Sequence, residues 1–291
     1  MEVPYLNLRT GLLKNPNLKV HPHIFIPLKV INFRMKKSLW VVGEFVRVRR
    51  RGERFLLEVD GRAGEYAARK IRSLIIVGEG EISSRAIQLA HKFNITIIFL
   101  DLTKERLGWL YRIPPPRMVE ALVNYLDLEE EVNRELREAA EYNRLMVARK
   151  LFGFSTSLEE AVKKFKGFSN SFLETVLKVY KLFLKAEVMD QLLRNNIMGV
   201  IDEEYVCKVF EPVTVWVTIY NLPETEGNLS DLSVLKVYLK YLKTSFEMIV
   251  PDVVGSNKLV EEHLKNTAEK LYGFLLNPIG KKLRVFRVGW S

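Results

Sequence analysis

The spacing of apolar residues is strand-like before residue 115 and helical after it. Ile71 to Val77 is an almost continuous run of apolar residues, many of them β-branched, which predicts a strand covered on both faces. Gly78 and Gly80 follow directly and tolerate positive φ angles, so they predict that this strand ends in a turn. The first half of the chain therefore predicts a sheet-forming domain.

Further strands and one helix are expected around that central strand. The strands are predicted at residues 39–49, 54–59, 95–100 and 107–111, with residues 50–53 as the turn of a hairpin. Between them, apolar residues recur at helical spacing. Ser83 or Ser84 can cap this helix, and Asn94 predicts its left-handed end.

Helices are expected to fill the second half, at residues 118–151, 158–165, 170–193, 206–220, 232–246 and 258–275, with residues 251–257 as the last connection. Asn170 to Leu193 carries an apolar stripe, which indicates core packing rather than a cofactor site. Pro114 to Pro116 cannot continue strand pairing and predict a stiff linker. The expected fold class is α+β: an N-terminal extension at 1–35, a β-sheet-rich mixed α/β domain at 36–115 and an all-helical domain at 116–291.

Composition narrows the class of protein. With 48% apolar and 27% charged residues, and no run of about 18 apolar residues, the chain is expected to be a soluble cytoplasmic protein without a membrane segment. Its one cysteine, Cys207, excludes an internal disulfide framework, and the four histidines lack the spacing of zinc ligands. Only two glutamines beside many lysines and glutamates favour a thermophilic source.

The net charge of +10 favours a polyanionic partner, with a solvated basic surface as the alternative. Basic residues gather in two places, and this clustering favours a nucleic acid. The nucleic-acid contacts are therefore predicted at Arg49, Arg50, Arg51, Lys163, Lys164 and Lys166.

The central strand, helix and following strand resemble part of a known family. The residues that carry the resemblance are IRSLIIVGEGEISSRAIQLA and ITIIFLD, with a β-rich segment before them and Gly108-Trp109-Leu110, three prolines and a helical half after them. In this order they resemble the family of CRISPR-associated protein one, the integrase that inserts new spacers into CRISPR arrays, over residues 36–291. The resemblance implies a homodimer formed by the N-terminal sheet domain, which binds double-stranded or branched DNA and works with a second small CRISPR adaptation protein.

Members of the resembled family are DNA endonucleases and integrases that hold Mg²⁺ or Mn²⁺ with a glutamate, a histidine and an aspartate. By this resemblance Glu160, or its neighbour Glu159, corresponds to the glutamate, Asp202 to the histidine and Lys208 to the aspartate. A lysine repels a cation at contact distance. A glutamate in the first turn of a helix is also favoured there by the helix dipole alone. The metal triad is therefore predicted to be degenerate.

Several interpretations of this site stay open. Lys208 could pair with Asp202, Glu159 or Glu160 in place of a metal, or Glu211 and Asp202 could form a makeshift carboxylate pair. Histidine and aspartate at positions 202 and 208 would then be expected to restore some Mn²⁺ binding. The favoured function is a CRISPR adaptation protein that binds or scaffolds DNA without cutting it. The alternatives are an active metal-dependent nuclease and integrase with altered ligands, and a basic scaffold protein unrelated to DNA.

Overall fold

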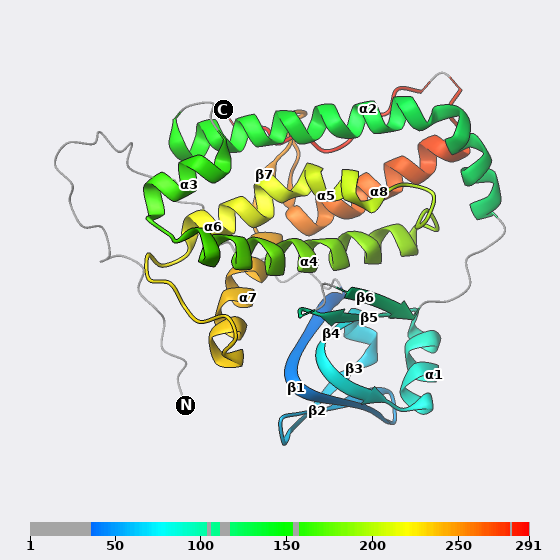
Figure 1. The fold of residues 1–291 in the computed structure, drawn as a ribbon. Coiled ribbons are helices and arrows are strands. Elements are labelled where there is room, and N and C mark those ends of the chain that lie inside the picture. The colour runs from blue at the N-terminus through cyan, green and yellow to red at the C-terminus, as the bar shows by residue number, and fades with distance from the viewer. Residues whose placement is uncertain (1–35, 104–105, 111–116, 154–156, 280, 291) are drawn as a thin grey trace.

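The protein is described here by a computed structural model that covers residues 36–103, 106–110, 117–153, 157–279 and 281–290. A sheet-rich half precedes a helical half, and the two pack against each other (Figure 1). The expected α+β class is therefore confirmed. The predicted extension at residues 1–35 and linker at Pro114 to Pro116 lie outside the described residues. None of the described helices has the length and apolar content that crossing a membrane requires.

Six strands form one mixed sheet in the order β3-β2-β1-β4-β5-β6. Their bounds are β1 Lys37–Arg51, β2 Arg54–Val59, β3 Arg62–Ala67, β4 Ile71–Ile82, β5 Thr96–Asp101 and β6 Arg106–Leu110. The pairs β1–β4 and β4–β5 are parallel, and the outer pairs are antiparallel. The two edges of the sheet are therefore β3 and β6.

The central strands are covered on both faces, as their continuous apolar run predicts. Ile75 and Ile98 belong to the large core that the sheet shares with the helical half. Leu74 and Ile97 point the other way, into a second core with helix α1 (Ser84–Phe93). Successive residues of a strand face opposite sides, so both sides of the sheet must be apolar here.

Both ends of α1 are formed by residues that the sequence indicates. The Ser83 hydroxyl accepts a hydrogen bond from the backbone N–H of Ala86, so Ser83 rather than Ser84 is the cap. Asn94 has a φ of 54° and ends the helix in the left-handed conformation. Asparagine tolerates this conformation better than most residues, because its short polar side chain bonds locally.

The prediction that Gly78 and Gly80 end the central strand is wrong, because β4 continues beyond both. Between Val42 and Phe45 the register of β1 against β4 shifts, as in a β-bulge. Gly78 has a φ of +111°, and a Cβ atom there would lie 1.9 Å from the carbonyl oxygen of Gly43. The glycine marks a close approach of two paired strands rather than a turn.

Three other details differ from the sequence prediction. Arg50 and Arg51 are the last residues of β1, so the hairpin turn is limited to residues 52–53. β3 was not expected, because its sequence RAGEYA lacks an apolar alternation. The last connection is bordered by two short paired strands, β7 (Ile249–Pro251) and β8 (Asn257–Leu259).

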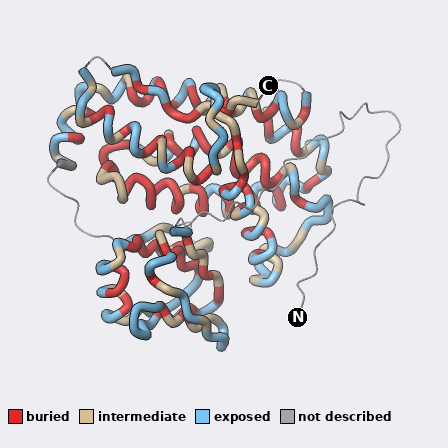
Figure 2. Tube along the Cα trace, turned by 180° about the vertical axis from the view of Figure 1, so that it is seen from behind, coloured by how far each residue is buried: buried red, intermediate tan, exposed pale blue. Residues whose placement is uncertain are grey.

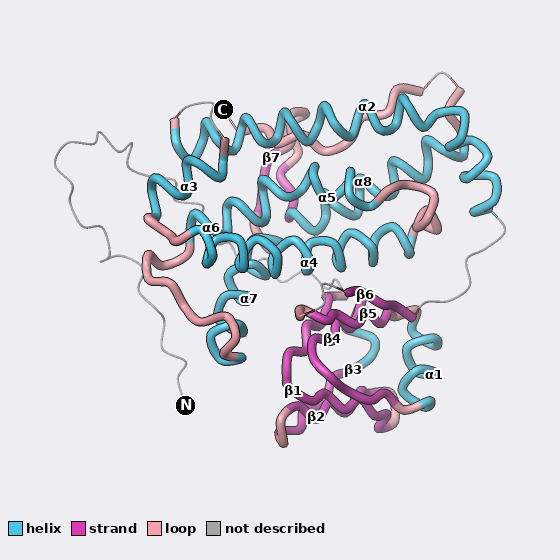
Figure 3. Tube along the Cα trace, in the orientation of Figure 1, coloured by secondary structure: helices cyan, strands magenta, loops and turns pink. Residues whose placement is uncertain are grey.

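The second half is helical, as predicted, and strands and helices are almost fully segregated (Figure 3). The helices are α2 Arg117–Phe152, α3 Leu158–Lys166, α4 Asn170–Arg194, α5 Glu203–Glu211, α6 Val217–Asn221, α7 Leu232–Phe246 and α8 Val260–Leu276. A π-helical turn at Pro212–Trp216 joins α5 to α6, so the β-branched segment 206–220 is helical. Buried residues line the inner faces of these helices and exposed residues the outer faces (Figure 2).

A buried cluster of charged residues joins the sheet to the helical half. Arg72 on β4 lies between three carboxylates: it contacts Glu187 at 2.5 Å and Asp190 at 2.9 Å, both on α4, and Glu261 on α8 at 3.5 Å. Burial lowers the pKa of Arg72, but the three negative charges outweigh it and the pKa is raised. The indole N–H of Trp40 donates to Glu187 at 2.7 Å. This cluster fixes the position of the sheet relative to α4 and α8.

Candidate functional site

Asp202 and Lys208, two of the residues that the family resemblance selects, lie on the same short helix, α5. Asp202 is its exposed N-cap, and one carboxylate oxygen accepts a hydrogen bond from the backbone N–H of Glu204 at 2.9 Å. Lys208 is six residues further along and also exposed. Six residues correspond to about 9 Å of rise and about 1.7 turns, so the two side chains leave the helix on different sides.

Lys208 interacts within its own helix. Its ammonium group lies 4.0 Å from a Glu204 carboxylate oxygen and 5.7 Å from the centre of the Tyr205 ring. Exposed pairs of this kind contribute little to stability. The expectation that Lys208 pairs with Asp202, Glu159 or Glu160 in place of a metal is therefore wrong. Histidine at 202 and aspartate at 208 would also leave the helix on different sides, about 1.7 turns apart, so they are not expected to share one ion.

Glu160, the third family-equivalent residue, is on α3 and exposed. It lies in the first turn of α3, as does Glu159, which pairs with Lys163 at 3.1 Å. Helix α3 packs on α2 and α6, whereas α5 packs mainly on α2 and α4. Glu160 therefore occupies the position that the helix dipole favours for an acidic residue, on a different helix from Asp202 and Lys208.

Tyr125 on α2 lies near Asp202, whereas Glu211 does not. Burial raises the pKa of Tyr125 on α2, and the nearby charges of Glu129 and Asp202 raise it further. Glu211 is at the other end of α5, where it pairs with Lys181 at 3.2 Å and accepts from the Trp216 indole at 3.1 Å. The makeshift pair of Asp202 and Glu211 is thus not formed.

The family's divalent ion does not fit the side chains at these positions. Asp202 offers carboxylate oxygens, but a lysine cannot ligate a cation and Glu160 belongs to another helix. In the part of the chain that the structure covers, no three His, Cys, Asp or Glu side chains come together in a group able to hold a metal ion. No reaction step through a metal is therefore derived for this site.

The first basic cluster is at the end of the β1–β2 hairpin. Arg49 is exposed, Arg50 donates to the backbone carbonyl of Gly52 at 2.8 Å, and Arg51 forms an ion pair with Glu65. The three side chains alternate between the faces of the strand, so they do not form one continuous surface.

The second basic cluster is on α3, far from the first (Figure 1). Lys164 is exposed, Lys163 pairs with Glu159, and Lys166 donates to the backbone carbonyl of Leu222 at 3.0 Å. Burial lowers the pKa of Lys166. The two clusters are on opposite halves of the molecule, so one DNA segment that contacts both must span the sheet and the helices.

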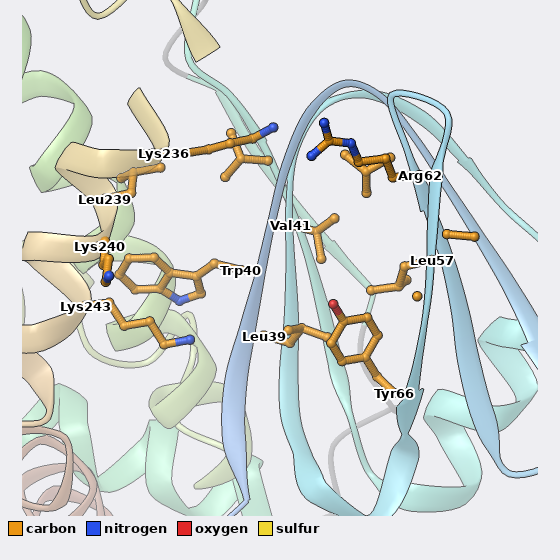
Figure 4. Close-up of a pocket in the computed structure, with 14 residues that line it drawn as sticks. Leu39, Trp40, Val41, Leu57, Arg62, Tyr66, Lys236, Leu239, Lys240 and Lys243 are labelled. Carbon is orange, nitrogen blue, oxygen red and sulfur yellow. The ribbon is translucent and has the colours of Figure 1, made fainter. Parts of the chain in front are cut away.

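Sequence reasoning missed a third basic surface, a groove between the sheet and α7 (Figure 4). This α7 groove has a volume of about 410 Å³. Its cations are Lys236, Lys240 and Lys243 on α7 and Arg62 on β3. The signal in the sequence is a lysine at i, i+4 and i+7 of a helix, which places all three on one face.

Solved structures show which known proteins share this fold. A casposase bound to an integration product is 14% identical with a TM-score of 0.66, and the match covers 85% of this chain and 92% of that chain. A CAS1 protein from Thermotoga maritima is 12% identical with a TM-score of 0.60, covering 82% and 97%. A Cas6-RT-Cas1–Cas2 complex is 11% identical with a TM-score of 0.63, covering 86% of this chain and 36% of that chain.

The sequence itself matches a protein family over more than half of its length. The match is to the family described as CRISPR associated protein Cas1 and covers residues 39–200. Comparison with curated proteins gives no match. The matched range includes the sheet, α1 and helices α2 to α4. This chain therefore belongs to the family of CRISPR associated protein Cas1.

Proposed function

We propose that this chain acts in CRISPR adaptation as a DNA-binding protein that does not itself catalyse metal-dependent strand transfer. Membership of the Cas1 family supports an integrase-like role in spacer acquisition. One structural relative is a casposase bound to an integration product, and another belongs to a Cas6-RT-Cas1–Cas2 complex. By analogy, the proposed partners are double-stranded or branched DNA and a second small adaptation protein, in the cytoplasm.

The observation that carries the catalytic part of this proposal is Lys208. A divalent ion at a phosphodiester needs anionic oxygen ligands to hold it. By its correspondence to the family aspartate, Lys208 places a positive charge where a ligand is needed. This charge is exposed on α5 rather than neutralised by a carboxylate of another helix. Incubation of the protein with Mn²⁺ and integration substrates, followed by detection of joined DNA, tests the proposed absence of strand transfer.

We propose that the protein is a homodimer formed through the sheet domain. β6 is an edge strand, and its Trp109 and Leu110 are 45% and 41% exposed. An exposed apolar edge strand is suited to pairing with a second chain. Leu122 and Leu126, near the start of α2, are also exposed.

Sedimentation at micromolar concentration is expected to show a dimer, and Trp109→Asp is expected to weaken its association at least about tenfold by burying a charge in the interface. Val254→Asp is the matched control, because Val254 is a 74% exposed apolar residue in the β7–β8 connection, away from the sheet domain. A wild-type monomer at this concentration would contradict the proposal.

Salt dependence of duplex binding tests the two basic clusters. Replacing Arg49, Arg50 and Arg51 by glutamine, or Lys163, Lys164 and Lys166 by glutamine, is expected to flatten the slope of log K against log salt by about 0.9 for each phosphate that the variant no longer neutralises. The change should be smaller than three such phosphates would give, because Arg51 and Lys163 already pair with carboxylates.

Lys258→Gln with Lys265→Gln serves as the control for charge alone, since both lysines are exposed and outside the clusters. Wild-type affinity and slope in both cluster variants, at every salt concentration, would show that DNA binds elsewhere. Absence of duplex binding by the wild-type protein would contradict the proposed function.

A further inference from the structure

Another groove, which we call the α8 groove, lies between the end of α8 and the C-terminal segment that returns beside it. It has a volume of about 420 Å³, and its walls are residues of α8 and residues 281–284. The segment, red in Figure 1, is fastened just beyond the groove, where Glu135 on α2 accepts from the Val285 backbone N–H at 3.0 Å and from Arg287 at 2.8 Å. This wall of the groove is therefore a fixed part of the fold.

The α8 groove is basic on both walls. Its cations are Lys270 on α8 and Lys281, Lys282 and Arg284 on the segment, and no acidic side chain of the described residues lines it. Within the described ranges, these four side chains have no ion-pair or hydrogen-bond partner. Like charges gathered around one groove repel each other, so an anionic ligand would be attracted by both walls at once.

The helix side of the groove contains a glycine that the packing of the chain does not require. Gly273 is exposed near the end of α8, and a Cβ atom there would meet no heavy atom of the described chain within 4 Å. Glycine destabilises a helix relative to alanine, so a side chain here would favour the fold. A helix position without a side chain instead lets the backbone of a ligand approach closely.

The opposite wall offers backbone groups for pairing. Lys282 and Arg284 are exposed and Leu283 between them is buried, which is the alternation of an extended segment. In the part of the chain that the structure describes, the backbone N–H and C=O groups of Lys282 and Arg284 form no hydrogen bond. Residues two apart on an extended segment present these groups on the same side. Such groups are what an added peptide strand pairs with.

We propose that the α8 groove binds an extended acidic segment of a partner protein, with its carboxylates on Lys282 and Arg284 and its backbone close to Gly273. Alternate side chains of an extended segment point to opposite sides, so acidic residues can face the cations while the others lie over the glycine. A DNA duplex fits less well, because phosphates reach lysine tips without approaching the helix and gain nothing from Gly273. The inference goes beyond the proposed DNA binding, because it concerns a protein partner and another surface.

The test measures fluorescence anisotropy of a labelled peptide of about ten residues that alternates glutamate with valine, at several salt concentrations. The full-length protein is expected to bind it at least about tenfold more tightly than the same peptide with glutamine for glutamate, and added salt should reduce the difference. Gly273→Leu should weaken binding at least about tenfold, because its side chain occupies the place of the peptide backbone. Its thermal midpoint should not fall, since leucine favours a helix over glycine. Gln88→Leu, which adds the same side chain at an exposed position of α1, should bind as the wild type does.

Lys281→Gln with Lys282→Gln tests the charge of the groove. It should weaken peptide binding at least about fivefold and make it less sensitive to salt. Lys163→Gln with Lys164→Gln removes the same number of lysines from α3 and should leave peptide affinity within about twofold.

The outcome for each ligand decides between a peptide site and a DNA site. Equal binding of the two peptides by the wild-type protein, or full affinity kept by Gly273→Leu, would overturn the groove inference. Loss of duplex affinity in Gly273→Leu would also overturn it, because the groove would then be a DNA site. Failure of the wild-type protein to bind a duplex would contradict the proposed function alone and leave the peptide result standing.

Discussion

Arg72→Met is expected to lower the free energy of unfolding by about 3–5 kcal/mol, the usual effect of removing one partner from a buried ion pair. Methionine keeps an unbranched apolar stem but leaves Glu187, Asp190 and Glu261 without the charge that they share. Asp190 keeps Arg194, which contacts it at 2.9 Å, so the loss falls mainly on Glu187 and Glu261. Urea unfolding measures the change.

The destabilisation should depend on pH. Burial raises the pKa of Glu261, and Arg72 opposes that rise, so the variant's Glu261 has a pKa raised further. A carboxyl group with a raised pKa in the folded state binds more protons folded than unfolded, and its contribution to stability falls as pH rises through that pKa. Arg72→Met should therefore be less destabilising at pH 5 than at pH 8.

Two further variants test whether the buried charges cause the loss of stability in Arg72→Met. Arg47→Met removes an arginine that pairs with Glu58 and Glu81 on the exposed side of the same sheet, and it should leave the unfolding midpoint nearly unchanged. Glu187→Gln added to Arg72→Met removes a buried charge and should recover part of the lost stability. If Arg72→Met unfolds at the wild-type midpoint, the cluster does not join the two halves energetically.

Most of the helices could be predicted from the sequence, because long amphipathic segments leave a strong periodic signal. Segment 206–220 was the hardest of these, since β-branched residues favour strands, yet it is helical through the π-helical turn. Packing in the core decided the conformation there, because Val206, Val209 and Val213 are fully buried.

The strands were predicted less completely, for reasons specific to each. β3 carries polar residues on both faces, and β7 and β8 have three residues each, too few to show a period. Glycine at position 78 allows a turn or a close strand approach equally, and only the position of Gly43 on the neighbouring strand distinguishes them.

The buried charge cluster could not be assigned from sequence, although one signal was present. Glu187 and Asp190 occur in a stretch of α4 that is buried on all sides, from Leu182 to Leu193 except for Lys185. Acidic residues in a fully buried stretch need a counter-charge. That the counter-charge is Arg72, more than a hundred residues away in the sequence, follows only from the fold.

The family-equivalent positions are selected by resemblance. Whether they can bind one metal ion depends on how their side chains are arranged in space, which the sequence does not show. The resemblance makes Asp202 and Lys208 two ligands of one site, but Asp202 is the N-cap of α5 and Lys208 lies within that helix, about 1.7 turns further along. The groove residues on α7 were missed because lysines at helical spacing are ordinarily a solvated face. These lysines line a groove only because strands of the sheet face α7, and the position of those strands is set by tertiary packing.

The second large effect is expected in catalysis: the wild-type protein should show no strand transfer above background with Mn²⁺ or Mg²⁺. The reason is that Lys208 is cationic and that Glu160 and Asp202 are on separate helices, so a divalent ion lacks a shared set of ligands. Lys208→Ala should also be inactive, because removing the positive charge does not supply a missing ligand. Lys208→Asp with Asp202→His should stay inactive for the same geometric reason.

The most direct measurement incubates the purified protein with Mn²⁺, a 3′-hydroxyl DNA end and a repeat-bearing duplex, and follows joined product on a denaturing gel. A Cas1 family member that retains all three metal ligands is the positive control, and EDTA is added in parallel. The degenerate-site account predicts joined product for the positive control alone. EDTA-sensitive joining by the wild-type protein, retained in Lys208→Ala, would contradict it and would mean that the ligands of a working metal site lie elsewhere in the chain.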